Sequence, residues 1–122
     1  MAYAWWNLGL RFALELAAVA AFAIAGWRLM SAPWNWVAAI ALPSIAMALW
    51  VTFAVPGDPS RSGAAPVPVP GLVRLALELI VLFGAALALV LSGHSGAGIA
   101  LAALTALHYA VSVERIVWLI GR

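Results

Sequence analysis

The fold class is decided by residues 72–91, whose sequence is LVRLALELIVLFGAALALVL. A helix rises about 1.5 Å per residue, so roughly 20 apolar residues cross the ~30 Å hydrocarbon core of a bilayer. Similar apolar runs occupy residues 5–29, 34–55 and 96–120. A transmembrane barrel would instead need segments of about ten residues with alternating polarity. The sequence therefore predicts an all-α integral membrane protein, a bundle of four transmembrane helices.

The composition of the 122-residue chain supports this class. Hydrophobic residues make up 67% of the chain and charged residues 8%, whereas a soluble domain has about half and about a quarter. The net charge of +2 is too small and dispersed to predict nucleic-acid binding. The chain has no Cys, which excludes disulfides and thiolate metal sites. Arg is used in place of Lys throughout, and Ala is abundant. This composition favours a bacterial origin, so we expect the protein to lie in the bacterial plasma membrane.

The arginines predict the orientation of the chain. Four spans place both termini on one side of the membrane, and only Arg28 falls toward the other side. Such a bias is typical of the cytoplasmic side, so we expect both termini to be cytoplasmic. Arg11 and Glu15 also interrupt what would be the apolar core of a signal peptide, so we expect the first helix to be retained. The arginines on the cytoplasmic side are Arg11, Arg61, Arg74, Arg115 and Arg122.

A proline-rich cytoplasmic loop at residues 56–70 divides this single domain, residues 1–122, into two helical hairpins. Its prolines block helix formation, and its Gly and Ser residues keep the segment loose. The motif RFALEL at residues 11–16 returns as RLALEL at residues 74–79, near the start of the first helix of each hairpin. Because each half holds two spans, we predict a duplication in which the hairpins are related in parallel.

Each copy of the motif places an Arg and a Glu on one helix face. Arg11 and Glu15 are four residues apart, as are Arg74 and Glu78, so each pair is stacked. The Arg can extend to the cytoplasmic headgroups, while the Glu lies about 6 Å deeper. Since a charge facing lipid costs at least about 2.5 kcal/mol, we expect these side chains to face inward and pair across helices.

The fourth helix runs in the opposite direction and brings Glu114 and Arg115 to the same layer. Glu114 lies about 12 Å from the end of the chain by helical rise. Small residues at spacing four from Gly98 onward make Glu114 the next position on a close-packing face. His108 lies about 9 Å deeper and is best interpreted as a hydrogen-bonded core histidine. His94 falls in the outer loop, so a haem with two axial histidines, or any other cofactor, is not predicted.

These charges and His108 form a candidate intramembrane polar site, which has two interpretations. One is a charge-balanced clamp that fixes the register of the helices. The other is a binding site for a proton, an ion or a lipid phosphate, because ionisable residues inside membranes often mark such pathways. We find no metal cluster, phosphate-binding glycine loop or nucleophile with a base, so no enzyme is predicted. The candidate residues are Arg11, Glu15, Arg74, Glu78, His108, Glu114 and Arg115.

Three motifs connect the chain with a known family. They are RFALELAA at residues 11–18, Trp50-x-x-Phe53-x-x-Pro56, and the proline-bearing loop leading into Arg74-Leu-Ala-Leu-Glu78-Leu. On these motifs the chain resembles the YrdB-like family of small bacterial membrane proteins. The resemblance implies four spans and no assigned activity. It also implies a Lys just after the proline, where this chain has Gly57-Asp58.

The chain is also similar to small multidrug-resistance transporters in its length, its four spans and a Glu in the first helix. Glu15 would take the place of the functional Glu of that family. The chain departs from the pattern in Arg11, which would neutralise Glu15, in the parallel repeat and in the additional Glu78.

Two functions follow from the sequence. The first is an accessory or scaffolding subunit of a larger membrane complex, whose lipid-facing Ala and Leu surfaces dock other membrane protein subunits. The second is a proton- or ion-coupled transporter of small molecules such as cations, lipophilic ones among them, acting as a homodimer because four helices enclose little volume. Anionic lipid bound at the arginines is a third possibility.

Overall fold

The computed structural model describes residues 2–59 and 65–122, and Arg61 of the orientation prediction lies outside them. Three helices in this part of the chain are long and apolar enough to cross a membrane, and a bent pair makes a fourth if it counts as one span. A short parallel strand pair follows the second helix. The elements are α1 (Trp5–Leu29), α2 (Trp34–Thr52), β1 (Phe53–Ala54), β2 (Val67–Pro68), α3 (Gly71–Leu91), α4 (Ser95–Ala110) and α5 (Val113–Ile120).

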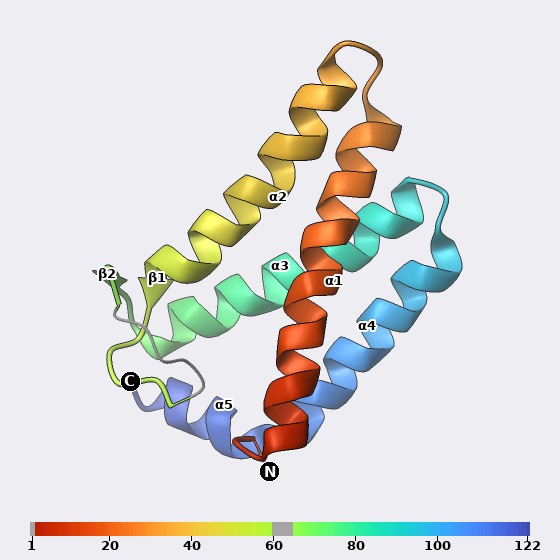
Figure 1. Cartoon of the computed structure of the whole chain (residues 1–122). Coiled ribbons are helices and arrows are strands. Elements are labelled where there is room, and N and C mark those ends of the chain that lie inside the picture. The colour runs from red at the N-terminus through yellow and green to blue at the C-terminus, as the bar shows by residue number, and fades with distance from the viewer. Residues whose placement is uncertain (1, 60–64) are drawn as a thin grey trace.

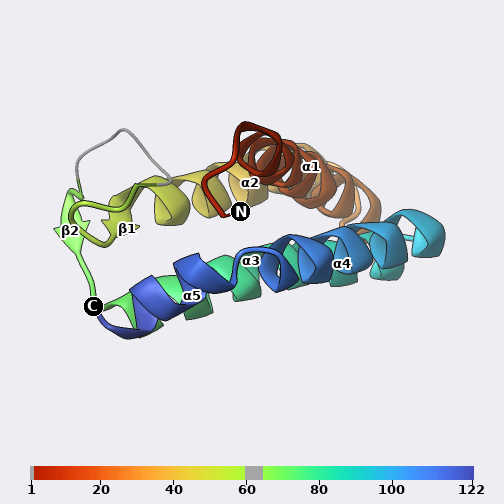
Figure 2. The ribbon, with the colours of Figure 1, turned by 90° about the horizontal axis from the view of Figure 1, so that it is seen from below.

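The helices form two hairpins that lie in two layers. Helices α1 and α2 pack against each other, as do α3 and α4. In Figure 1 both hairpin tips lie toward the upper part of the view, and both termini lie near its lower end. Figure 2 shows the α1 and α2 hairpin stacked on the layer of α3, α4 and α5. Helix α1 joins the layers, because it also packs against α3 and α4.

The buried faces of α1 and of α4 with α5 follow alternating steps of three and four residues. This spacing keeps one face of a helix turned toward its neighbours. On α1 the buried positions that follow these steps are Asn7, Arg11, Leu14, Ala18, Ala21 and Ala25, and Gly26 is buried beside them. On α4, the break and α5 they are Gly98, Leu101, Thr105, His108, Ser112, Arg115 and Leu119, and Tyr109 is buried beside them.

The expected small-residue face at spacing four, and with it the inward placement of Glu114, is wrong. Residues at a constant spacing of four turn gradually away from the buried face, or seam, that the alternating steps define. Ala106 and Ala110 are therefore exposed. Glu114 lies one position before the seam and is also exposed, whereas Arg115 is buried.

The single helix expected over residues 96–120 is also corrected, because it breaks between Ala110 and Val113 and turns by 72°. At the break, the Ser112 hydroxyl donates to the His108 carbonyl at 2.5 Å and accepts from Asn7 Nδ2 at 2.8 Å. A hydroxyl bonded to the carbonyl four residues earlier often bends a helix. Helix α5 consequently packs against α3 instead of continuing the line of α4.

The crossing of α3 and α5 is a backbone contact that requires glycine. A Cβ atom added to Gly71 would lie 1.6 Å from the carbonyl oxygen of Leu119. A small residue at a crossing lets two helix backbones approach closely. Gly71 therefore holds the start of α3, which carries Arg74 and Glu78, directly against the end of α5.

Candidate functional site

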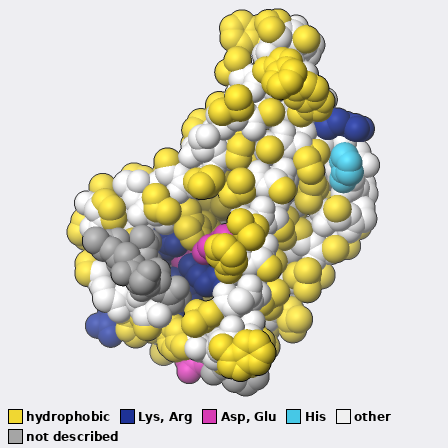
Figure 3. Space-filling view, viewed as in Figure 1, with side chains coloured by type: hydrophobic (Ala, Val, Ile, Leu, Met, Phe, Trp, Pro, Cys, Tyr) yellow, Lys and Arg dark blue, Asp and Glu magenta, His cyan; other side chains and the backbone are white. Residues whose placement is uncertain are grey.

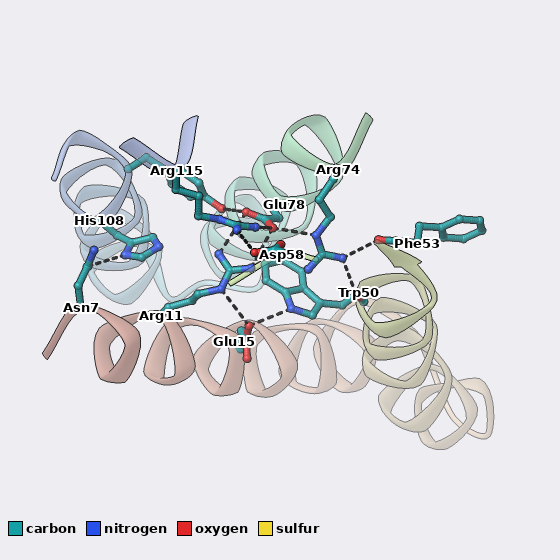
Figure 4. A network of polar contacts seen from close by, with 11 residues as sticks. Asn7, Arg11, Glu15, Trp50, Phe53, Asp58, Arg74, Glu78, His108 and Arg115 are labelled. Atoms are coloured by element: carbon teal, nitrogen blue, oxygen red, sulfur yellow. Dashed lines mark hydrogen bonds and ion pairs between the residues drawn. The ribbon is translucent and has the colours of Figure 1, made fainter. Parts of the chain in front are cut away.

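Glu78 on α3 is the centre of a polar cluster (Figure 4), and its side chain is 0% exposed. Its Oε2 atom accepts from Arg74 Nε at 2.8 Å, Arg115 Nη2 at 2.6 Å and Arg11 Nη2 at 2.8 Å. Its Oε1 atom accepts from Tyr109 Oη at 2.7 Å and Arg11 Nη1 at 3.2 Å. A carboxylate has about four lone-pair sites. These five donors therefore saturate Glu78 and leave no room for a proton or another ligand.

The donors to Glu78 come from four different helices. Arg11 lies on α1, Arg74 on α3 itself, Tyr109 at the end of α4 and Arg115 on α5. Arg11 bonds both carboxylate oxygens, the two-pronged geometry that gives strong and directional ion pairs. One buried carboxylate thus ties the two layers together and fixes the position of the broken fourth helix.

Asp58, in the turn after β1, is a second buried acid. Arg115 Nη1 donates to Asp58 Oδ1 at 2.5 Å, and the preceding Ala54 and Val55 are also buried. The sequence prediction missed Asp58, because residues 56–70 were expected to be a loose linker. One signal was present, since an acid follows the proline where the family resemblance implies a Lys.

Glu15 lies at the edge of the same cluster, with 30% of its side chain exposed. Its Oε1 atom accepts from Trp50 Nε1 at 2.9 Å and lies 3.7 Å from Arg11 Nε. The guanidinium carbons of Arg11 and Arg74 lie 5.2 and 4.8 Å from the centre of the Trp50 ring, within range of a cation–π interaction. Arg74 Nη1 also donates to the carbonyls of Trp50 and Phe53, so it holds the end of α2.

The cluster contains three guanidinium groups and three carboxyl groups, so it is neutral when all of them are ionised. Isolated buried charges are strongly destabilising, whereas paired and hydrogen-bonded ones are tolerated. The inward pairing expected from the sequence is present, with Glu78 as the shared partner. We define the buried cluster as Arg11, Glu15, Asp58, Arg74, Glu78 and Arg115.

Two predicted site residues lie outside the buried cluster. Glu114 is exposed on α5 and accepts a hydrogen bond from the Ala2 backbone nitrogen. The third carboxyl group of the buried cluster, which the sequence prediction assigned to Glu114, is that of Asp58. His108 is buried, with its Nδ1 atom 2.8 Å from Asn7 Oδ1. Asn7 also bonds Ser112 at the helix break, so His108 belongs to the packing between α1 and α4. Within residues 2–59 and 65–122, no three His, Asp or Glu side chains are grouped to hold a metal ion.

These helices and this cluster define a small helical protein, with three or four helices suited to crossing a membrane and an ionic centre shared by three of its helices. The chain belongs to the family described as "Protein of unknown function (DUF2568)", which it matches over residues 9–106. It is 40% identical over 116 residues to "Uncharacterized protein YrdB" of Bacillus subtilis (strain 168), covering 95% of this chain and 94% of that relative. The resemblance to the YrdB-like family is thereby confirmed. No solved structure matches the chain.

Proposed function

We propose that this protein is a non-catalytic accessory subunit of a larger complex in the bacterial plasma membrane. In this proposal its two parallel-related hairpins form a four-helix transmembrane unit with both termini in the cytoplasm. The observation that carries the proposal is the exposure of α2. Only 11% of the apolar window of α2 is buried, compared with 39% for α3.

The contacts of the buried cluster support a structural role for its charges. Glu78 already accepts five donors, and the three arginines around it are buried. A carrier for a proton or a cation needs a carboxylate that can release its partners at low cost. Glu78 is instead suited to holding α1, α3 and α5 in fixed positions, so that α2 is presented to a partner by a rigid support.

The free side of α2 has the composition of a helix interface. Pro43 and Ala46 are the buried positions of this helix. On the opposite side, Ala41, Ser44 and Ala48 follow steps of three and four residues, and Ser44 and Ala48 are exposed. Small residues at such spacing let a second helix approach closely in a membrane. The partner in this proposal is a transmembrane helix of a different chain.

Site-directed cross-linking tests this proposal, because the chain has no Cys of its own. A single Cys is introduced at Ser44 on α2, and a control Cys at the exposed Ile99 on α4. Both variants are labelled in native membranes with a thiol-reactive photo-cross-linker. We expect one discrete adduct with a different chain for Ser44→Cys and no discrete adduct for Ile99→Cys.

Two results of this experiment would count against an accessory role. The absence of any discrete adduct at Ser44→Cys would remove α2 as a docking surface. An adduct formed solely with a second copy of the chain would indicate a homodimer, and the ion-coupled transporter would then be the better hypothesis.

A further inference from the structure

An apolar groove runs between α1 and α2, with α3 as its floor. It encloses about 170 Å³, and Glu15 is the one charged residue among its described walls. Figure 3 shows this face of the protein hollowed, with acidic and basic side chains visible inside a largely apolar surface. We call this feature the α1/α2 groove; its main apolar walls are Phe12, Leu16, Val19, Met47, Val51 and Leu82.

Glu15 presents one carboxyl oxygen away from the buried cluster. The contacts from Trp50 Nε1 and Arg11 Nε both fall on its Oε1 atom. Figure 4 shows the other oxygen of Glu15 pointing away from Glu78 and its arginines. Glu15 also lines the groove and is 30% exposed. A group bound in the groove can therefore reach a carboxylate oxygen without breaking the ion pairs of Glu78.

The groove is polar at one end and apolar along its length. Trp50, the partner of Glu15, lies two residues before the end of α2, or about 3 Å along the helix axis. Val19 lies four residues beyond Glu15, about 6 Å toward the hairpin tip. A ligand that matches this arrangement has a small polar head near the membrane surface and an apolar tail directed into the bilayer.

We propose that the α1/α2 groove binds one phospholipid with an ethanolamine headgroup. The ammonium of that headgroup donates a hydrogen bond to Glu15, and part of one acyl chain lies along Leu16, Val19 and Met47. A lipid is the favoured occupant because the walls at Phe12, Leu16 and Met47 are exposed on the side of the hairpin that would face the bilayer.

The charge of Glu15 favours an ethanolamine headgroup. The guanidinium groups next to the groove already bind carboxylates of the protein, so the group offered to a ligand is the acid of Glu15. An ammonium complements this acid in charge and donates N–H hydrogen bonds, and hydrogen bonds to charged groups are the stronger ones. A choline headgroup carries the same charge but has no N–H donor, which makes it the matched comparison.

The test counts retained lipids by native mass spectrometry. The intact protein is reconstituted in nanodiscs with equal amounts of ethanolamine, choline and glycerol phospholipids, and then released from them. We expect one ethanolamine lipid per chain, preferred over the choline lipid roughly tenfold, as one hydrogen bond to a charged group provides. Glu15→Gln should bring this preference close to parity, whereas Glu114→Gln, at an exposed site on α5, should leave it unchanged.

A second variant keeps the test decisive if Glu15→Gln does not fold. Met47→Trp fills the groove without altering a charge, so it should abolish retention of the lipid. Equal retention of ethanolamine and choline lipids by the unchanged protein would overturn headgroup recognition. A preference for the glycerol lipid, no retained lipid, or full retention by Met47→Trp would overturn the site.

Discussion

Replacement of Glu78 by Gln should destabilise the folded protein strongly. Gln has nearly the same shape as Glu, but it removes the charge that Arg11, Arg74 and Arg115 share. Glu78 is 0% exposed and the three arginines are buried, so water cannot compensate for the loss. Removing one partner from a buried ion pair costs roughly 3–5 kcal/mol. Because Gln can still accept hydrogen bonds through one oxygen, we expect the lower end, about 3 kcal/mol, or roughly a hundredfold in the folding equilibrium.

The free energy of unfolding can be measured by titrating the protein in mild detergent with sodium dodecyl sulfate and following helix content by circular dichroism. Glu114→Gln is the matched control, since Glu114 is an exposed Glu on α5. Gln can also accept the bond from the Ala2 backbone nitrogen, so this variant should lose less stability than one ordinary hydrogen bond contributes. A loss below about 1 kcal/mol for Glu78→Gln would refute the reasoning, because this is the size of an ordinary single hydrogen bond. The ion pairs around Glu78 would then not hold the helices together.

Two further substitutions test the loop contact and the helix crossing. Asp58→Asn weakens the 2.5 Å contact with Arg115, and we expect a loss of about 1–3 kcal/mol, smaller than for Glu78→Gln, in the same titration. Gly71→Ala forces α3 away from α5 at Leu119, so it should lower the thermal midpoint of unfolding in detergent. A Cβ atom added at Gly9 would meet open space, so Gly9→Ala should leave this midpoint unchanged or raise it. Equal midpoints for the two alanine variants would contradict the close crossing.

Much of the helical structure could be predicted because the length of an apolar run is a local property of the sequence. The helices containing Arg11 and Glu78 fall close to the predicted ranges, whereas Arg115 lies on a short helix that is separated by a break from the rest of the predicted range 96–120. The inward direction of these side chains could also be predicted, since charges facing lipid are costly. What could not be predicted was that all three arginines meet at Glu78, because that choice depends on how the hairpins stack.

The errors arise where distant residues decide a local conformation. Ser112 stands at the break of the fourth helix and is held by Asn7, which lies more than 100 positions earlier in the chain. Asp58 was missed for a related reason, because Arg115, its partner, lies 57 positions away. The misplacement of Glu114 has a different cause, since a constant step of four residues leads to Glu114, whereas the buried positions follow alternating steps of three and four that reach Arg115.

The repeated motif also shows the limit of inference from sequence similarity. Glu15 and Glu78 occupy the same position in RFALEL and RLALEL. Glu78 is completely buried, and Tyr109 and Arg115 reach it from α4 and α5. Glu15 instead meets Trp50 and stays partly exposed beside the α1/α2 groove. The two nearly identical motifs thus have different surroundings. We assign Glu78 a structural role and Glu15 a role in ligand binding.

The mass of the protein complex isolated gently from native membranes tests the accessory role most directly. We predict that this chain is found in fixed stoichiometry with at least one different membrane protein. Ser44→Phe, which places a large side chain on the free side of α2, should release that partner, while Ile99→Phe on α4 should retain it. A monomer or a homodimer alone, with no larger species, would contradict the proposed function.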